Sequence, residues 1–295
     1  MALDGEAQKF INLFLAAECL SEVRNHYDIK STANQLLTHL KSLLHYGDYQ
    51  RAVEVGSSEE YYLIHTVRIQ AVIAVVTTWQ NDTNTLAWLK SLVLSDQHGV
   101  VRAEAVREIA KGWKENSDTL PFLKSIVQSD KHPAVRYTAT RELAKGWRDN
   151  PDTLPWLKQH AQSDEHSDVR TASVQEIAKG WRDDLDTLTI LKTCALSDEA
   201  ALVRYVAVQE LARGWKDEHW MFDFLCDRAL NDPFELQEDS ADNPRQLALE
   251  LIIKQYRDHP QTLPLCKDRA ENDPDEQVRE FAREKLKNWV DVSNP

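Results

Sequence analysis

The chain has 295 residues, of which 42% are hydrophobic, and a formal net charge of −13 from 48 acidic and 35 basic residues. This balance argues against nucleic-acid binding, which normally needs a basic face that displaces counterions. No N-terminal run combines a basic start with a long apolar stretch, and the longest apolar segments are shorter than about 18 residues. We therefore expect a cytoplasmic protein without a signal peptide or a membrane span.

The four cysteines are far apart and show no metal-ligand spacing: Cys19, Cys194, Cys226 and Cys266. This arrangement predicts buried or half-buried free thiols in a reducing compartment. The sequence predicts neither a metal site nor a cofactor.

Residues 1–58 are predicted to form two helices. One apolar stripe consists of Phe10, Phe14, Ala17 and Leu20, and a second consists of Leu36, Leu37, Leu40, Leu43 and Leu44. We interpret both as capping helices that cover the open end of the region that follows. Residues 55–58 are predicted to be a short loop.

Residues 59–295 contain a repeat of 34 residues. Five tryptophans recur with this period: Trp79, Trp113, Trp147, Trp181 and Trp215. An arginine precedes each of them by 11 residues: Arg68, Arg102, Arg136, Arg170 and Arg204. Such a period predicts an all-α solenoid built from tandem two-helix units.

Each unit is predicted to contain two helices. The first begins at an Asp-Thr-Leu signal, where Asp152 or Thr153 can cap the free N–H groups, and it ends near Ser163 and Asp164. The second begins near Val169 and ends at Gly180 and Trp181.

The repeat continues to the end of the chain, with one interruption. Arg245 and Tyr256 keep the 11-residue spacing but follow Arg204 and Trp215 by 41 residues. This offset predicts a seven-residue insertion near residues 235–242. With Arg279 and Trp289 as the last copy, we count about seven repeats.

The repeated arginine lies on the apolar arc of the second helix. On a helical wheel Arg170 falls beside Val169, Ile177 and Trp181. It needs a partner there, because an unpaired buried charge is costly. An aspartate recurs six residues before the arginine. We therefore predict an Asp–Arg ladder in which these aspartates pair with arginines of their own or the adjacent repeat: Asp130, Asp164 and Asp198.

This pair of residues resembles the pattern of HEAT repeats and of their shorter relatives in phycobilin-lyase-type proteins, over roughly residues 60–290. The Glu-Ile-Ala-Lys-Gly-Trp block at 108–113 and 176–181 is similar to the C-terminal repeats of bacterial NACHT-type NTPases. Residues 13–25 resemble the helix that precedes those repeats. No GxxxxGK[ST] loop is present, so the resemblance implies the repeat region without ATPase activity.

Several repeated side chains could suggest chemistry, but we interpret them as structural. His98, His132 and His166 are expected to be exposed turn residues, because equivalent positions in neighbouring repeats lie about 10 Å apart. The glutamates three residues before Lys111, Lys145, Lys179 and Arg213 are expected to form surface pairs: Glu108, Glu142, Glu176 and Glu210.

The repeated tryptophans could form a ligand-stacking row, but their place in the apolar arc favours a role in the core. Trp88 and Trp156 belong to the first helix and are expected to be partly exposed. We predict no catalytic residues, because the candidate groups repeat, whereas an active site is normally singular.

The outer arc of the second helix varies between copies and is the better functional lead. The positions ten, nine and six before the tryptophan are expected to face away from the core. Tyrosine and arginine are enriched at binding hot spots. The candidate partner-binding residues are Arg107, Tyr137, Arg141, Gln175, Tyr205 and Gln209.

We therefore predict a non-enzymatic scaffold that binds a protein partner on the concave face of the solenoid, with neither nucleic acid nor membrane as a partner. The NACHT resemblance implies a sensor or regulatory module. The alternative is a phycobilin lyase or bilin chaperone, since such proteins also use HEAT-like repeats. A remnant without independent function is a third interpretation.

Overall fold

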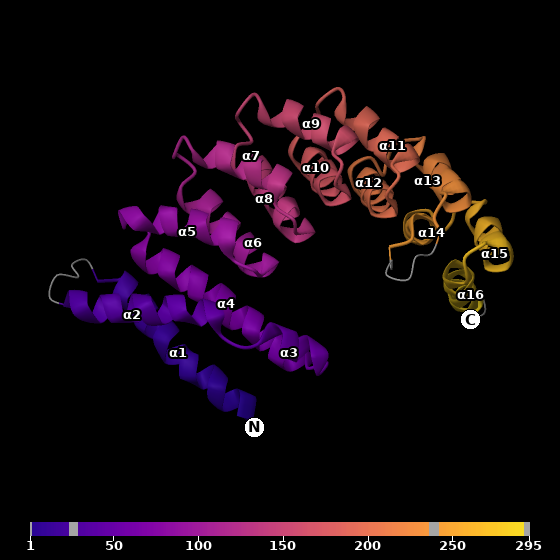
Figure 1. The fold of residues 1–295 in the computed structure, drawn as a ribbon. Helices are drawn as coiled ribbons and strands as arrows, with labels where there is room; N and C mark the ends of the chain where they lie inside the picture. The colour runs from indigo at the N-terminus through magenta and orange to yellow at the C-terminus, as the bar shows by residue number, and fades with distance from the viewer. Residues whose placement is uncertain (1, 24–28, 236–241, 292–295) are drawn as a thin grey trace. The chain divides into compact units, whose positions relative to one another are not determined.

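A computed structural model describes residues 2–23, 29–235 and 242–291. Within these residues the regular elements are all helices, arranged in successive two-helix repeats (Figure 1). The predicted fold class, an all-α solenoid, is therefore confirmed. The chain divides into two compact units, Met1–Gly146 and Trp147–Pro295.

In the first unit, three N-terminal helices and a 3-10 turn pack around the long helix α4, and two repeats follow. The elements are α1 (Ala2–Ser21), α2 (Lys30–Ser42), η2 (Leu43–His45), α3 (Tyr49–Glu54), α4 (Ser58–Trp79), α5 (Thr83–Ser95), α6 (Gly99–Gly112), α7 (Thr119–Ser129) and α8 (Pro133–Gly146). Both predicted N-terminal stripes contribute buried residues, including Ala17, Leu20, Leu40 and Leu44. The short helix α3 was not predicted.

Among the described helices, α4 alone is long and apolar enough to cross a membrane, which the sequence analysis did not anticipate. In the first unit α4 is packed against α1, α2, α3 and α6. Its side chains Ile64, Val67, Ala71, Val72 and Val75 are buried there. Its apolar composition is therefore accounted for by its central place among other helices.

The second unit contains four repeats. Its helices are α9 (Thr153–Ser163), α10 (Ser167–Gly180), α11 (Thr187–Ser197), α12 (Ala201–Gly214), α13 (Met221–Asn231), α14 (Pro244–Gln255), α15 (Thr262–Asn272) and α16 (Glu276–Asp291). Figure 1 shows the odd-numbered helices of this unit in one layer and the even-numbered helices in a second layer. The predicted bounds of the two helices in the repeat at 153–180 agree with α9 and α10 to within two residues.

The Asp-Thr-Leu signal was predicted to cap the helix that it begins, and this prediction is wrong for α9. Neither Asp152 nor Thr153 makes an N-terminal side-chain cap in α9. Instead the buried Thr153 hydroxyl donates to the carbonyl oxygen of Trp147 at 2.7 Å, and Thr187 donates likewise to Trp181 at 2.7 Å. The threonine thus adds a second donor to a carbonyl oxygen that follows the preceding second helix and that also accepts a backbone N–H, from Asn150 or Asp184.

The repeated tryptophans are less buried than predicted. Trp79 is buried, but Trp113, Trp147, Trp181 and Trp215 are half-buried. The glycine before each of these four tryptophans is the final residue of a second helix, so each tryptophan directly follows a helix end. In the second unit the guanidinium groups of Arg148 and Arg182 lie over the rings of Trp181 and Trp215, 5.7 and 5.3 Å from the centroids.

The predicted insertion lies between α13 and α14. Its central part, 236–241, is outside the described residues. Arg245 nevertheless keeps the role of the repeated arginine, because its Nη1 donates to the carbonyl oxygens of Asp232 and Phe234 at 2.9 and 2.8 Å. The second helix α14 therefore keeps its contact with the preceding turn after the insertion.

Candidate functional site

An Asp–Arg ladder joins neighbouring repeats, as predicted. In four repeats the arginine donates its Nε hydrogen to the aspartate that begins the next inter-helix turn. The four pairs within the two units are Arg102–Asp130, Arg170–Asp198, Arg204–Asp232 and Arg245–Asp273, at 2.8, 2.8, 2.9 and 3.2 Å. The sequence left open whether the partner belongs to the same repeat, and the structure places it in the following one.

The same arginine also binds its own turn. Arg102 Nη1 donates to the carbonyl oxygen of Asp96 at 2.7 Å, and Arg170 Nη1 donates to that of Asp164 at 2.7 Å. Hydrogen bonding to Asp130 raises the pKa of Arg102 despite burial. Each arginine therefore holds two successive turns together, which is a structural role.

The six predicted binding residues lie on the second helices, and all are exposed or half-buried. We call them the variable strip; Arg107, Tyr137 and Arg141 belong to the first unit. Arg107 binds Glu104 at 2.5 Å, and the Arg141 guanidinium lies 5.5 Å from the Tyr137 ring centroid. This part of the strip therefore offers a guanidinium group close to an aromatic ring.

In the second unit the strip consists of Gln175, Tyr205 and Gln209. Tyr205 is half-buried and Gln209 is exposed. Burial first, and then the carboxylates of Asp242 and Glu250, raise the pKa of the Tyr205 phenol. At neutral pH this hydroxyl is therefore protonated and can donate a hydrogen bond.

The strip is narrower than predicted. The position nine before the tryptophan was expected to face outward, but Thr138, Ala172 and Val206 are all buried. Second helices of adjacent repeats pack against each other, as α6 does with α8 and α10 with α12. Neighbouring second helices lie on both flanks of α6 and of α12, so position nine is covered there.

The repeated glutamates are not the surface residues that we expected. Glu108, Glu176 and Glu210 are buried, and Glu142 is half-buried. The predicted spacing to a cation is kept, since Lys111 lies 4.0 Å from Glu108 and Lys145 lies 3.7 Å from Glu142. Burial raises the pKa of Glu108 and of Glu210. Packing of neighbouring second helices again explains the difference.

The repeated histidines lie in the turns, as predicted, but only His132 is exposed. His98 and His166 are half-buried. The His132 ring covers Gly99 of the preceding repeat so closely that an added Cβ would lie 2.6 Å from it. The turn that contains His132 therefore packs against the start of the second helix in the preceding repeat. Among the described residues, no group of three or more His, Cys, Asp or Glu side chains is placed to hold a metal ion.

All four cysteines are free thiols. Cys194 and Cys266 are buried and Cys226 is half-buried, as predicted, but Cys19 is exposed. Burial raises the pKa of Cys194 to about 12 and that of Cys226 and Cys266 to about 11. These three thiols are poor nucleophiles at neutral pH.

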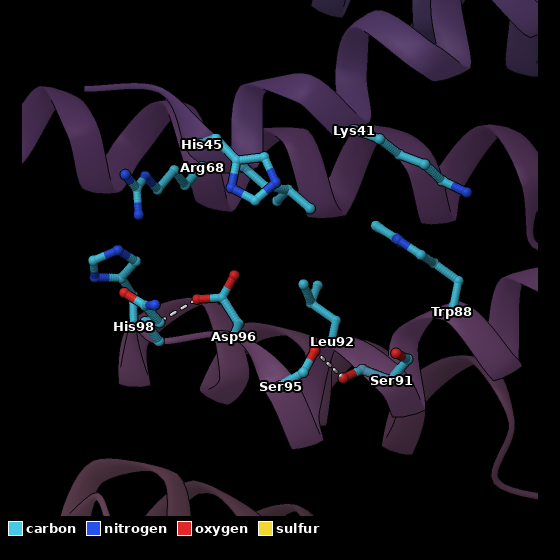
Figure 2. Close-up of a pocket in the computed structure, with 11 residues that line it drawn as sticks. Lys41, His45, Arg68, Trp88, Ser91, Leu92, Ser95, Asp96 and His98 are labelled. Atoms are coloured by element: carbon cyan, nitrogen blue, oxygen red, sulfur yellow. Dashed lines mark hydrogen bonds between the residues drawn. The ribbon is translucent and has the colours of Figure 1, made fainter. Parts of the chain in front are cut away.

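A polar pocket in the first unit was missed by the sequence analysis. It has a volume of about 500 Å³. Figure 2 shows that its polar lining consists chiefly of Lys41, His45 and Arg68 on one side and Trp88, Asp96 and His98 on the other. The sequence signal was the four-residue spacing of Lys41 and His45, but only folding brings these residues beside the first inter-helix turn.

Comparison with known proteins supports the repeat assignment. Residues 86–178 and 120–212 match the family model of HEAT repeats. This part of the chain is therefore HEAT-like, and such repeats are generally non-catalytic protein-interaction scaffolds. No curated protein and no solved structure matches the chain significantly.

Proposed function

We propose that this chain is a non-enzymatic scaffold that binds a protein partner through the variable strip on its second helices, on the concave face of the solenoid. The observation that carries the proposal is the contrast between repeated and varied positions. The repeated Asp, Arg and Thr residues bind other parts of the chain. Position six before the tryptophan is accessible in four successive repeats and changes from Arg107 and Arg141 to Gln175 and Gln209, as a surface fitted to one partner requires.

Two features of the strip suit protein recognition. Tyr137, Arg141 and Tyr205 are of the residue types enriched at interface hot spots. The strip is also carried by helices that pack against neighbouring second helices, so little conformational entropy is lost when a partner binds.

A capture experiment from native cells tests the proposal. The full-length protein, Arg141→Ala and Tyr205→Ala are used as baits, and bound proteins are identified by mass spectrometry. Gln128→Ala and Gln159→Ala are matched controls, because these exposed residues lie on the first helices α7 and α9. A partner that is lost from both strip variants but kept by both controls supports the scaffold. A partner that all four variants retain contradicts it.

The finer proposal is a sensor or regulatory module related to NACHT-type systems, in the cytoplasm. It is supported by the Glu-Ile-Ala-Lys-Gly-Trp blocks at 108–113 and 176–181. The same experiment tests it, because the captured partner should then include a NACHT-type NTPase. The bilin alternative stays a prediction, which a visible-absorbance titration with bilin tests.

A further inference from the structure

The pocket in the first unit gathers cationic side chains from separate segments of an acidic chain. Lys41 comes from α2, His45 from η2, Arg68 from α4 and His98 from the turn between α5 and α6. Among the described lining residues, Asp96 supplies the only carboxylate. Among the lining residues Lys41 and Arg68 therefore outnumber the carboxylate even when both histidines are neutral.

The ladder changes at its first arginine, which lines this pocket. Arg102 directs Nε and Nη2 to the Asp130 carboxylate, each at 2.8 Å. Arg68 lies one repeat length before Arg102 in the sequence, but it directs Nε and Nη2 to the carbonyl oxygens of Tyr46 and Gly47, at 2.9 and 3.1 Å. Figure 2 shows the Asp96 carboxylate directed into the space below His45.

The next repeat provides an internal comparison. Its equivalent pocket is smaller, about 310 Å³, and its charged lining residues are Asp96, Arg102, Asp130 and Lys131. Two cations there face two carboxylates, and Arg102 and Asp130 bind each other directly. The excess of positive charge is therefore a property of the first pocket and not of the repeat.

One wall of the pocket is an aromatic ring. Trp88 is half-buried, and the ammonium group of Lys41 lies 4.8 Å from its ring centroid. A flat apolar group can pack against the indole while an anionic substituent reaches Lys41. The volume of about 500 Å³ lies in the range of small-molecule sites, roughly 300–1,000 Å³.

We propose that this pocket binds a small organic anion, a phosphate or carboxylate on a flat ring, with the anionic group between Lys41 and His45 and the ring against Trp88. An anion there offsets a cost that the folded chain carries. Burial lowers the pKa of Lys41 and of Arg68, each only partly opposed by an aspartate, Asp82 and Asp96 respectively. Burial is the largest effect that lowers the pKa of His98. Arg68, Arg102 and His45 lower this pKa further, and Asp96 opposes them.

Isothermal titration calorimetry of the full-length protein tests the proposal with phenyl phosphate, benzoate, inorganic phosphate and phenol. We expect saturable one-to-one binding of phenyl phosphate or benzoate, and the stronger of the two identifies the anionic group. Inorganic phosphate and phenol should bind more weakly, because each lacks one half of the ligand. A thermal melt of every variant shows that it is folded.

Lys41→Gln and His45→Gln should each weaken binding about tenfold, the loss expected for one hydrogen bond to a charged group. Lys90→Gln is the matched control, because Lys90 lies 5.3 Å from the Phe122 ring centroid but does not line the pocket. Lack of saturable binding to the unmodified protein overturns the proposal, as does an equal effect of Lys41→Gln and Lys90→Gln. The protein-binding strip is tested separately, so either proposal can fail alone.

Discussion

The Arg170 guanidinium group donates hydrogen bonds from Nε and Nη2 to the two carboxylate oxygens of Asp198, at 2.8 and 2.9 Å. The two residues are 28 positions apart and belong to successive repeats. Both side chains are nearly inaccessible, with exposures of 5% and 7%. A bidentate ion pair with so little solvent has both high directionality and little screening.

Removing one partner of this pair should therefore be severe. Arg170→Ala leaves the Asp198 carboxylate buried without its guanidinium partner, and we expect a loss of about 3–5 kcal/mol in the free energy of unfolding. Urea denaturation followed by circular dichroism measures it. The double variant Arg170→Ala/Asp198→Ala should lose clearly less than the sum of the two single variants. Additive losses would show that the pair is not coupled.

The threonine that links successive helices is a second test of the repeat. Thr187→Val removes the side-chain donor to the Trp181 carbonyl oxygen, keeps the side-chain shape and leaves the Asp184 N–H as the remaining donor, and we expect a loss of about 1–2 kcal/mol. Thr193→Val is the control, because this exposed threonine bonds to Thr189 within its own helix. It should change stability by less than about 0.5 kcal/mol. Equal effects of the two changes in thermal denaturation would refute the linking role.

The ladder should weaken in acid. Burial favours the neutral form of Asp130, but hydrogen bonds from Arg102 and from the His132 backbone outweigh it and hold the pKa of Asp130 below its usual value. Its stabilisation is therefore fully present above the unfolded pKa of about 3.9 and is lost as pH falls through the lower folded pKa.

Urea denaturation of the unmodified protein and of Asp130→Asn between pH 6 and 2 checks this pH dependence. The variant should be less stable at pH 6, and the difference should shrink below about pH 4. A difference that stays constant down to pH 2 would contradict the assigned ion pair.

The cysteines should differ sharply in reactivity. Cys19 is exposed, whereas burial raises the pKa of Cys194 to about 12 and that of Cys266 to about 11. In a thiol assay with Ellman's reagent at pH 8, we expect a fast phase from Cys19 and slow reaction of the rest until the chain is unfolded. Cys19→Ser should abolish the fast phase. A fast phase that survives this change would place a second reactive thiol on the surface.

The sequence alone determined the repeat and its helices. Residues such as Thr153, Arg170 and Gly180 recur because each repeat has to join two helices, hold a turn and end a helix. The helix bounds near 153–163 and 167–180 follow from these signals and from the apolar period. The existence of the ladder followed from a charge on an apolar arc, which requires a partner.

Only the tertiary structure decided what neighbouring repeats cover. A helical wheel gives the direction of a side chain from its own helix, but adjacent second helices bury Glu176, Glu210 and Ala172 from the sides. The same limit applies at the N-terminal end, where Arg68 turns to backbone carbonyls because helices of a different kind precede it. The resulting pocket joins residues far apart in sequence, so no local pattern could predict it.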